Sequence, residues 1–267
     1  MVAACRAIET ARPNGLVRDP FAEQLAGERG MAIARGLPRL EIMCFGVGIR
    51  SRFLDELVTE AVAVRKVETV LSLGAGLDTR PWRLDLPVRL RWIEVDFPAM
   101  LDYKAAVMAP YQPKCRLERV AADLNEASER RLVFAGVGAP ALMITEGLLA
   151  YLPSETVEAL AVEPTRAGGV RYWLLDLASP EVAQRVQMDS YESIQRVRAS
   201  NHLNGTEILA ILSRNGWTSV ERRTYTMDAW QAAQDRIRAL AGGQAASGQT
   251  TPPPSDDPSG VHLFSRA

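Results

Sequence analysis

Residues 68–96, which read ETVLSLGAGLDTRPWRLDLPVRLRWIEVD, decide the fold. Glu68–Leu73 is a short apolar run, and Gly74 and Gly76 follow it directly, so this segment predicts a buried strand that ends in a tight turn. Leu90–Val95 predicts a second strand. A strand, a glycine-containing turn, a helical stretch and a second strand together form the first unit of a parallel sheet.

The same alternation continues along the chain. Further strands are expected at Leu117–Ala122, Ala141–Thr145, Val170–Leu175, Thr218–Thr224 and Val261–Ser265. The stretches between the first five strands are long enough for helical crossovers, which predicts an α/β fold with helices on the faces of a parallel sheet. An acidic residue follows each of the second to fifth strands, at the edge where open parallel sheets bind ligands.

Two regions are expected: a helical cap and substrate lid at residues 1–66, and an α/β domain at residues 67–267. The clearest helix of the cap spans about Ile49–Arg65. Residues 242–260 are rich in Gly, Pro, Ser and Thr, so we expect a disordered insert there. The α/β domain should contain further helices at about Glu181–Arg198, Thr206–Asn215 and Asp228–Leu240.

Composition excludes several classes of protein. The 267 residues carry 31 basic and 32 acidic side chains, a balance that argues against nucleic acid or an anionic membrane as a partner. No apolar run approaches the ~18 residues of a membrane span, and the N-terminus does not resemble a secretory signal, so we expect a cytoplasmic protein. Three scattered cysteines and two histidines, Cys5, Cys44, Cys115, His202 and His262, offer no metal site.

The residues at the ends of the first and second predicted strands give the clearest indication of a bound ligand. Gly74 and Gly76 allow the backbone to pass close under a ligand. Asp96 lies 20 residues after Gly76, the offset typical of an acid that binds ribose hydroxyls. Thr79 stands where the dinucleotide motif has its third glycine, so that motif is incomplete. Glu94 on the same strand is the alternative acid for the ribose, but its deeper position is more consistent with a partly buried side chain that is paired within the protein. The pattern favours a nucleoside ligand.

Arg50 falls on the apolar stripe of its predicted helix, with Phe53 and Leu57 at helical spacing. A guanidinium directed toward a core keeps its charge and requires an anion. That anion is either part of a ligand or an internal carboxylate, and the sequence leaves both possibilities open.

Several segments together resemble the leucine carboxyl methyltransferase family, and more closely its bacterial S-adenosylmethionine-dependent branch, which acts on polyketides and other small molecules. The resemblance covers about residues 6–225. It rests on RAIETARPNGLVRDPFA, GIRSRFLDE, LSLGAGLDTRPWRL, WIEVDFPAMLDYK, AADLNE and ITEGLLAYLP. It implies a class I methyltransferase (Rossmann-like) fold, a seven-stranded mostly parallel sheet with an N-terminal helical cap. It also implies an O-methyltransferase that uses S-adenosylmethionine and a carboxylate or hydroxyl of a small-molecule acceptor.

The resemblance implies roles for the residues around the adenosine of the donor. Gly74 and Gly76 would form the loop under its amino-acid and ribose portions. Asp96 would bind the ribose hydroxyls, and Asp123 with the Leu124 backbone would bracket the adenine.

It also implies roles at the methionine end. Arg50 would bind the carboxylate of the methionine moiety, and Glu146 would face its amino group. Tyr151 would border the acceptor pocket. For a carboxylate acceptor we add Arg80 as a candidate cation beside a helix N-terminus. For a phenol acceptor, His202 is a candidate base, although the sequence favours a surface histidine without that role.

Two alternatives remain. A nicotinamide-dependent reductase shares the strand, glycine turn and acid, but Thr79 and the spacing of Tyr111 and Lys114 do not match a Tyr-x-x-x-Lys pair. A donor-binding protein without turnover is the second alternative.

Overall fold

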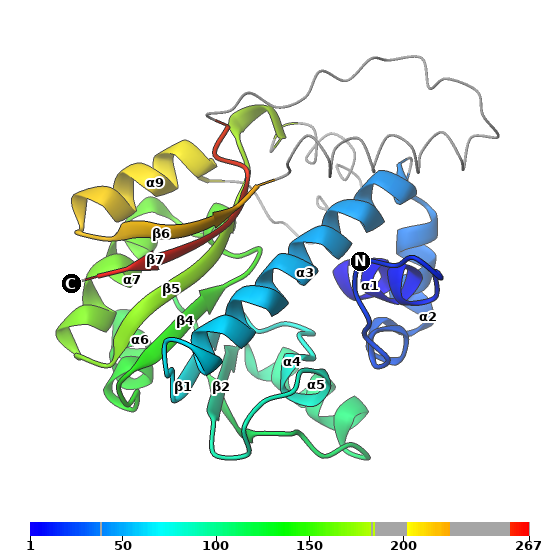
Figure 1. The fold of residues 1–267 in the computed structure, drawn as a ribbon, viewed down its shortest axis with the longest axis horizontal. Coiled ribbons are helices and arrows are strands. Elements are labelled where there is room, and N and C mark those ends of the chain that lie inside the picture. The colour runs from blue at the N-terminus through cyan, green and yellow to red at the C-terminus, as the bar shows by residue number, and fades with distance from the viewer. Residues whose placement is uncertain (38, 183, 185–201, 225–256, 267) are drawn as a thin grey trace.

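The computed structural model describes residues 1–37, 39–182, 184, 202–224 and 257–266 (Figure 1). Its centre is a seven-stranded sheet in the order β3-β2-β1-β4-β5-β7-β6. The first five strands in the chain run parallel, and β7 is antiparallel to both β5 and β6. This arrangement confirms the expected mostly parallel sheet. The strands are β1 (Thr69–Leu73), β2 (Arg91–Asp96), β3 (Arg116–Ala121), β4 (Ala141–Thr145), β5 (Val170–Leu177), β6 (Thr218–Arg223) and β7 (Gly260–Ser265).

Helices cover both faces of this sheet. The described helices are α1 (Val2–Thr10), α2 (Ala22–Arg35), α3 (Leu40–Ala63), α4 (Arg80–Arg83), α5 (Pro98–Met108), α6 (Ala127–Ala135), the short 3₁₀ helix η1 (Leu149–Tyr151), α7 (Ser154–Arg166) and α9 (Gly205–Arg214). Side chains of α6, α7 and α9 form one apolar core with one face of the sheet. The C-terminal half of α3 packs against the other face and crosses it diagonally (Figure 1).

Successive side chains along a strand point to opposite faces of the sheet, so they enter two different apolar cores. On β5, Trp173 and Leu175 enter the core with α7 and α9, whereas Leu174 enters the core with α3. The Trp173 and Trp217 rings meet edge to face with centroids 5.4 Å apart. Because both faces of the inner strands are buried, these strands read as continuous apolar runs in the sequence.

The expected strand positions agree with the structure to within two residues. The expected strand Ala141–Thr145 has the same bounds as β4, and β5 continues two residues beyond its expected end at Leu175. Helix α3 begins at Leu40, nine residues before the expected start at Ile49. The boundary between a cap at 1–66 and the α/β domain stays a prediction, because α3 packs directly on the sheet.

Other expectations fall largely outside the described residues. These are most of the expected helix Glu181–Arg198, the whole of Asp228–Leu240, and residues 242–256 of the expected insert. None of the described helices is long and apolar enough to cross a membrane. Among the described residues there is no cluster of three or more potential metal ligands, and Cys5, Cys44 and Cys115 are buried free thiols.

A buried ion pair joins β2 to α5. Lys104 Nζ lies 2.5 Å from Glu94 Oε1, and both side chains are fully buried. Arg119 Nε on β3 lies 3.2 Å from the other carboxylate oxygen of Glu94. Lys104 and Arg119 also lie over the Trp82 ring, at 5.6 and 5.8 Å from its centroid. Glu94 is therefore the paired acid of β2 that the sequence suggested, and it leaves Asp96 as the acid at the strand end.

We predict that K104M lowers the free energy of unfolding by about 3–5 kcal/mol, because it leaves Glu94 buried with only Arg119 opposite. Urea denaturation followed by circular dichroism measures this loss. The matched control is R91M, which breaks the partly exposed pair with Glu118 and should cost at most ~1 kcal/mol. Equal losses in the two variants would contradict the importance of the buried pair.

Candidate functional site

The glycine bend after β1 lies directly against the end of β2. Gly74 and Gly76 have φ values of 61° and 45°, in the region that favours glycine. The Gly76 N–H donates to Asp96 Oδ2 at 2.7 Å, and the Phe97 N–H donates to Asp96 Oδ1 at 2.7 Å. A carboxylate has about four acceptor positions, so two backbone bonds leave Asp96 able to accept from a ligand.

The two glycines differ in what surrounds them. A Cβ at Gly74 would lie 2.9 Å from Leu148 Cδ1, so the protein itself fills that space. A Cβ at Gly76 would meet only the Gly74 carbonyl oxygen, at 3.9 Å. The backbone at Gly76 thus faces open space, as expected where a ligand passes over the bend.

A cation from α3 meets two acids at the ends of β4 and β5. Arg50 Nε lies 3.1 Å from Glu146 Oε1, and Arg50 Nη1 donates to Asp176 Oδ2 at 3.0 Å. Asp176 Oδ1 in turn accepts the Gly147 N–H at 2.6 Å. Gly147 has φ of 60°, and a Cβ there would lie 3.6 Å from Arg50 Nη1. The inward cation that the sequence identified therefore has internal carboxylate partners.

Arg80 is the most buried arginine of the site, with 2% of its side chain exposed. Its Nε donates to Asp55 Oδ1 at 2.7 Å, and its Nη1 lies 2.8 Å from Glu146 Oε2 and 3.0 Å from Asp78 Oδ2. Arg83 holds the same Asp55 with two bonds, at 2.5 and 2.7 Å. Here Arg80 binds three carboxylates of its own chain, and its contact with an acceptor stays a prediction.

These side chains form one charge cluster, which we define by its members. Three arginines face four carboxylates in it: Arg50, Arg80, Arg83, Asp55, Asp78, Glu146 and Asp176. The cluster joins α3, the glycine bend, α4 and the ends of β4 and β5.

The arginines keep the buried acids of this cluster ionised. Burial opposes the charge of Glu146, but Arg80 and Arg50 outweigh burial and lower the pKa of its carboxyl. Burial likewise opposes the charge of Asp78, and the combined effect of Arg80, Lys104 and Arg83 lowers its pKa from 3.8 to about 2. At neutral pH both groups are therefore anions.

The N-terminal helix is bound to the glycine bend as well. Arg6 Nη2 on α1 donates to the Leu77 carbonyl at 2.5 Å, and its Nε donates to Asp19 Oδ2 at 2.8 Å. The same Asp19 oxygen accepts the Thr79 hydroxyl at 2.7 Å. Thr79, which departs from the dinucleotide motif, thus serves as a contact between the bend and the N-terminal region.

Tyr151 lies on η1, close enough to Arg50 and Asp176 for both to affect it. Burial raises the pKa of the Tyr151 hydroxyl, Asp176 adds to this effect and Arg50 opposes it. The phenol is therefore protonated at neutral pH and can donate a hydrogen bond. The backbone N–H of His202, an exposed residue, donates to the Ala150 carbonyl at 2.7 Å. The structure thus brings the His202 backbone next to η1, 51 residues away in the sequence.

Asp123 and Leu124 follow β3, one strand further out than Asp96. The Asp123 N–H donates to Glu129 Oε2 at 2.7 Å, and Asp123 Oδ1 accepts the Asn125 N–H at 2.9 Å. The Leu124 carbonyl accepts from Arg130 Nη1 at 2.7 Å. This loop is held by its own contacts on the same carboxyl edge as Asp96, and its contact with an adenine stays a prediction.

Sequence reasoning missed several members of the site. Asp176 belongs to the row of acids after the predicted strands, and that signal could have identified it. Asp55 and Asp19 lie on elements whose sequence shows no sign of their distant partners, Arg80 and Arg6.

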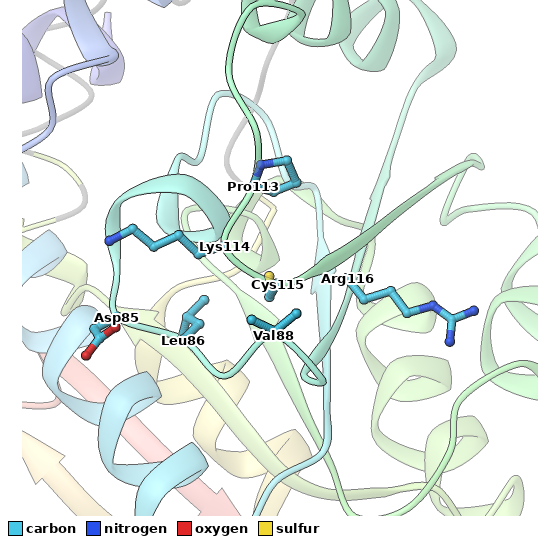
Figure 2. A pocket seen from close by; sticks show the side chains of 7 residues that line it. All are labelled: Asp85, Leu86, Val88, Pro113, Lys114, Cys115 and Arg116. Carbon is cyan, nitrogen blue, oxygen red and sulfur yellow. The ribbon is translucent and has the colours of Figure 1, made fainter.

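A surface pocket of about 680 Å³ lies near the amino-terminal ends of β2 and β3, whereas the site lies at the carboxyl ends of the strands. Figure 2 shows the residues that line this pocket. Its lining comes from the segment before β2 and from the start of β3, which are the amino-terminal ends of parallel strands. Leu86, Val88 and Cys115 lie together there, whereas Lys114 and Arg116 point away in opposite directions (Figure 2). Burial raises the pKa of the Cys115 thiol to about 11, so it is not a reactive thiolate.

Comparison with known proteins identifies relatives of this chain. A sequence model of the family described as leucine carboxyl methyltransferase matches residues 1–163. A Streptomyces avermitilis protein named "Putative S-adenosyl-L-methionine-dependent methyltransferase" is 39% identical over 203 residues, which are 71% of each chain. A Streptomyces coelicolor protein with the same descriptive name is 39% identical over 171 residues, 60% of each chain.

The solved structures show the fold. A DUF574 family protein from Streptomyces avermitilis superposes with a TM-score of 0.60 at 15% identity, over 100% of this chain and 97% of the other. At that identity the likeness concerns the arrangement of helices and strands.

We predict that the free energy of unfolding falls as the pH is lowered from about 5 toward 2, partly through Asp78. Its pKa is depressed in the folded protein, so its stabilising contribution is present above 3.8 and is lost as the pH approaches about 2. The contribution is on the order of 2 kcal/mol. Urea titrations at pH 7, 5, 4 and 3 should show a weaker pH dependence in D78N than in the wild type.

The control is D85N, which removes an exposed carboxyl at the other end of the sheet and should leave the pH dependence unchanged. A D78N profile that parallels the wild type over this range would contradict the role assigned to Asp78.

Proposed function

The chain belongs to the leucine carboxyl methyltransferase family and is an S-adenosylmethionine-dependent methyltransferase, and from this premise we propose that it methylates an oxygen of a small-molecule acceptor. The acceptor group would be a carboxylate or a hydroxyl. The observation that supports the donor site is the bond between the Asp96 carboxylate and the Gly76 N–H, beside a glycine bend that faces open space.

The residues present fit the donor. Asp96 has acceptor positions for two ribose hydroxyls, and such charge-assisted hydrogen bonds are about twice as strong as neutral ones. Gly76 admits the ligand because no side chain occupies the space above it. Asp123 and the Leu124 backbone, on the neighbouring loop, would bracket the adenine.

The methionine end of the donor carries a carboxylate and an ammonium group, and the charge cluster offers both kinds of partner. Arg50 would bind the carboxylate, and Glu146 would accept from the ammonium group. When bound, S-adenosylmethionine supplies an electrophilic methyl group on a sulfonium. The protein's own contribution is orientation, which in favourable cases provides effective molarities of ~10⁵–10⁸ M.

An oxygen acceptor suits the groups around Tyr151. A carboxylate is already ionised at neutral pH and needs no base. The Tyr151 hydroxyl stays protonated and can donate a hydrogen bond to an acceptor oxygen, while Glu146 is engaged by two arginines. A phenol or alcohol acceptor benefits from a base, and His202 beside η1 is the candidate for that role.

We predict that D96A weakens S-adenosylhomocysteine binding by about 1.5–3 kcal/mol, the scale of hydrogen bonds to a charged group. D96N, which retains an oxygen for the Gly76 N–H, tests the charge alone. Isothermal titration calorimetry measures both, with D102A on the exposed face of α5 as the control. Wild-type affinity in D96A would remove Asp96 from the donor site.

Turnover is tested with a panel of small carboxylic acids, phenols and alcohols, with isotopically labelled donor and mass spectrometry of the product. We expect a methyl ester or a methyl ether. Methylation of nitrogen or carbon alone would contradict the oxygen acceptor. Donor binding without any product across the panel would favour a donor-binding protein, and NADH binding in a fluorescence titration would favour a reductase.

A further inference from the structure

We propose that Asp176 is a positioning residue for the donor: it fixes Arg50 and the Gly147 backbone in the arrangement that receives the amino-acid end of S-adenosylmethionine. This inference rests on the proposed donor site. It assigns a role to an acid that lies within β5 and contacts two groups of that site at once.

The register of the sheet sets the position of Asp176. Strands β4 and β5 pair Thr145 with Leu175. Glu146 and Asp176 each come one residue after this pair, so two carboxylates stand side by side on neighbouring parallel strands. Like charges at neighbouring positions repel, and a cation between them relieves the repulsion. Arg50 is that cation, with contacts of 3.1 Å to Glu146 and 3.0 Å to Asp176.

The second oxygen of Asp176 acts on the backbone. Its Oδ1 accepts the Gly147 N–H at 2.6 Å, at a residue whose φ of 60° favours glycine. One carboxylate therefore holds a guanidinium with one oxygen and the turn after β4 with the other. A Cβ at Gly147 would approach Arg50 Nη1 to 3.6 Å, which shows how closely the turn and the guanidinium pack.

Asp176 contacts a different nitrogen of Arg50 from the one that lies near Glu146. Glu146 is shared between Arg50 and Arg80, whereas Asp176 contacts Arg50 and the Gly147 N–H. About a fifth of the side chains of Arg50 and Asp176 is exposed, so the pair borders the site instead of lying deep in the core. Loss of the Asp176 charge would therefore remove the contact that holds Arg50 Nη1 at the end of β5.

The test compares two ligands that share the nucleoside and the sulfur. S-Adenosylhomocysteine has the amino-acid end, and 5′-methylthioadenosine lacks it. In D176N we expect binding of S-adenosylhomocysteine to weaken by about tenfold, whereas binding of 5′-methylthioadenosine stays within about twofold of the wild type. Calorimetry measures the affinities, and thermal denaturation confirms that each variant is folded.

The matched control is E118Q, which neutralises an acid on β3 that is likewise paired with an arginine, Arg91, outside the site. It should change neither affinity. D176S, which removes the carboxylate with a smaller side chain, is measured in parallel and should show the same selective loss for S-adenosylhomocysteine. A double variant R50A/D176N should bind S-adenosylhomocysteine no more weakly than R50A, because D176N keeps an oxygen for the Gly147 N–H and removes only the charge that acts on Arg50.

Several results would overturn the inference. These are equal affinities for D176N and the wild type, an equal loss for both ligands, or failure of both D176N and D176S to fold, which would make Asp176 a folding residue. Failure of the proposed function is a separate result, because the wild-type protein would then bind neither ligand.

Discussion

The buried guanidinium of Arg80 is the interaction on which the arrangement of the site depends. A guanidinium cannot lose its charge, so its burial requires anions, and Asp55, Asp78 and Glu146 provide them. These three acids belong to α3, the glycine bend and the end of β4. Breaking a buried ion pair costs far more than the pair contributes to stability, so the network restricts the alternatives available to the chain. The three elements are thereby fixed relative to one another.

The position of Arg50 follows from this constraint. Asp55 lies on α3 a little more than one helical turn after Arg50, so the contacts of Asp55 with Arg80 and Arg83 set the rotation of that helix. The same rotation places Leu54, Leu57 and Val58 against the sheet. The apolar packing and the ion pairs therefore favour the same orientation of α3. In this orientation Arg50 reaches the ends of β4 and β5. The cluster has one more carboxylate than arginines, a balance that suits a ligand with net positive charge.

The sequence predicts the sheet well because its signals are local. A strand buried on both faces, such as Ala141–Thr145, is an apolar run that can be read directly, and its end is marked by an acid and a glycine. The contact between Gly76 and Asp96 also follows from spacing, since it joins the ends of adjacent strands. Glu94 was interpreted as a paired acid from its deeper position on the same strand, and its pair with Lys104 confirms this.

The partners of the buried arginines could not be predicted in the same way. Arg80 contacts Asp55 and Glu146, which lie 25 and 66 residues away, and the choice among many acids depends on the packing of three elements. The inward direction of Arg50 was readable from the apolar stripe, but helical periodicity does not reveal which anion it meets. The start of α3 at Leu40 was missed because the apolar stripe that identified the helix lies in its second half.

The site has two parts that different elements hold. Asp96 ends β2 and Asp123 follows β3, and their carboxylates accept backbone N–H groups of the adjoining loops and of the glycine bend. Arg50 lies on α3, Glu146 directly follows β4 and Asp176 lies in β5, and Arg50 contacts both acids. In the donor site that we propose, the nucleoside would lie on the first part and the amino-acid end on the second. Arg80 joins α3 to the end of β4, and β1 lies between β2 and β4 in the sheet, so the rigid core of the fold connects the two parts.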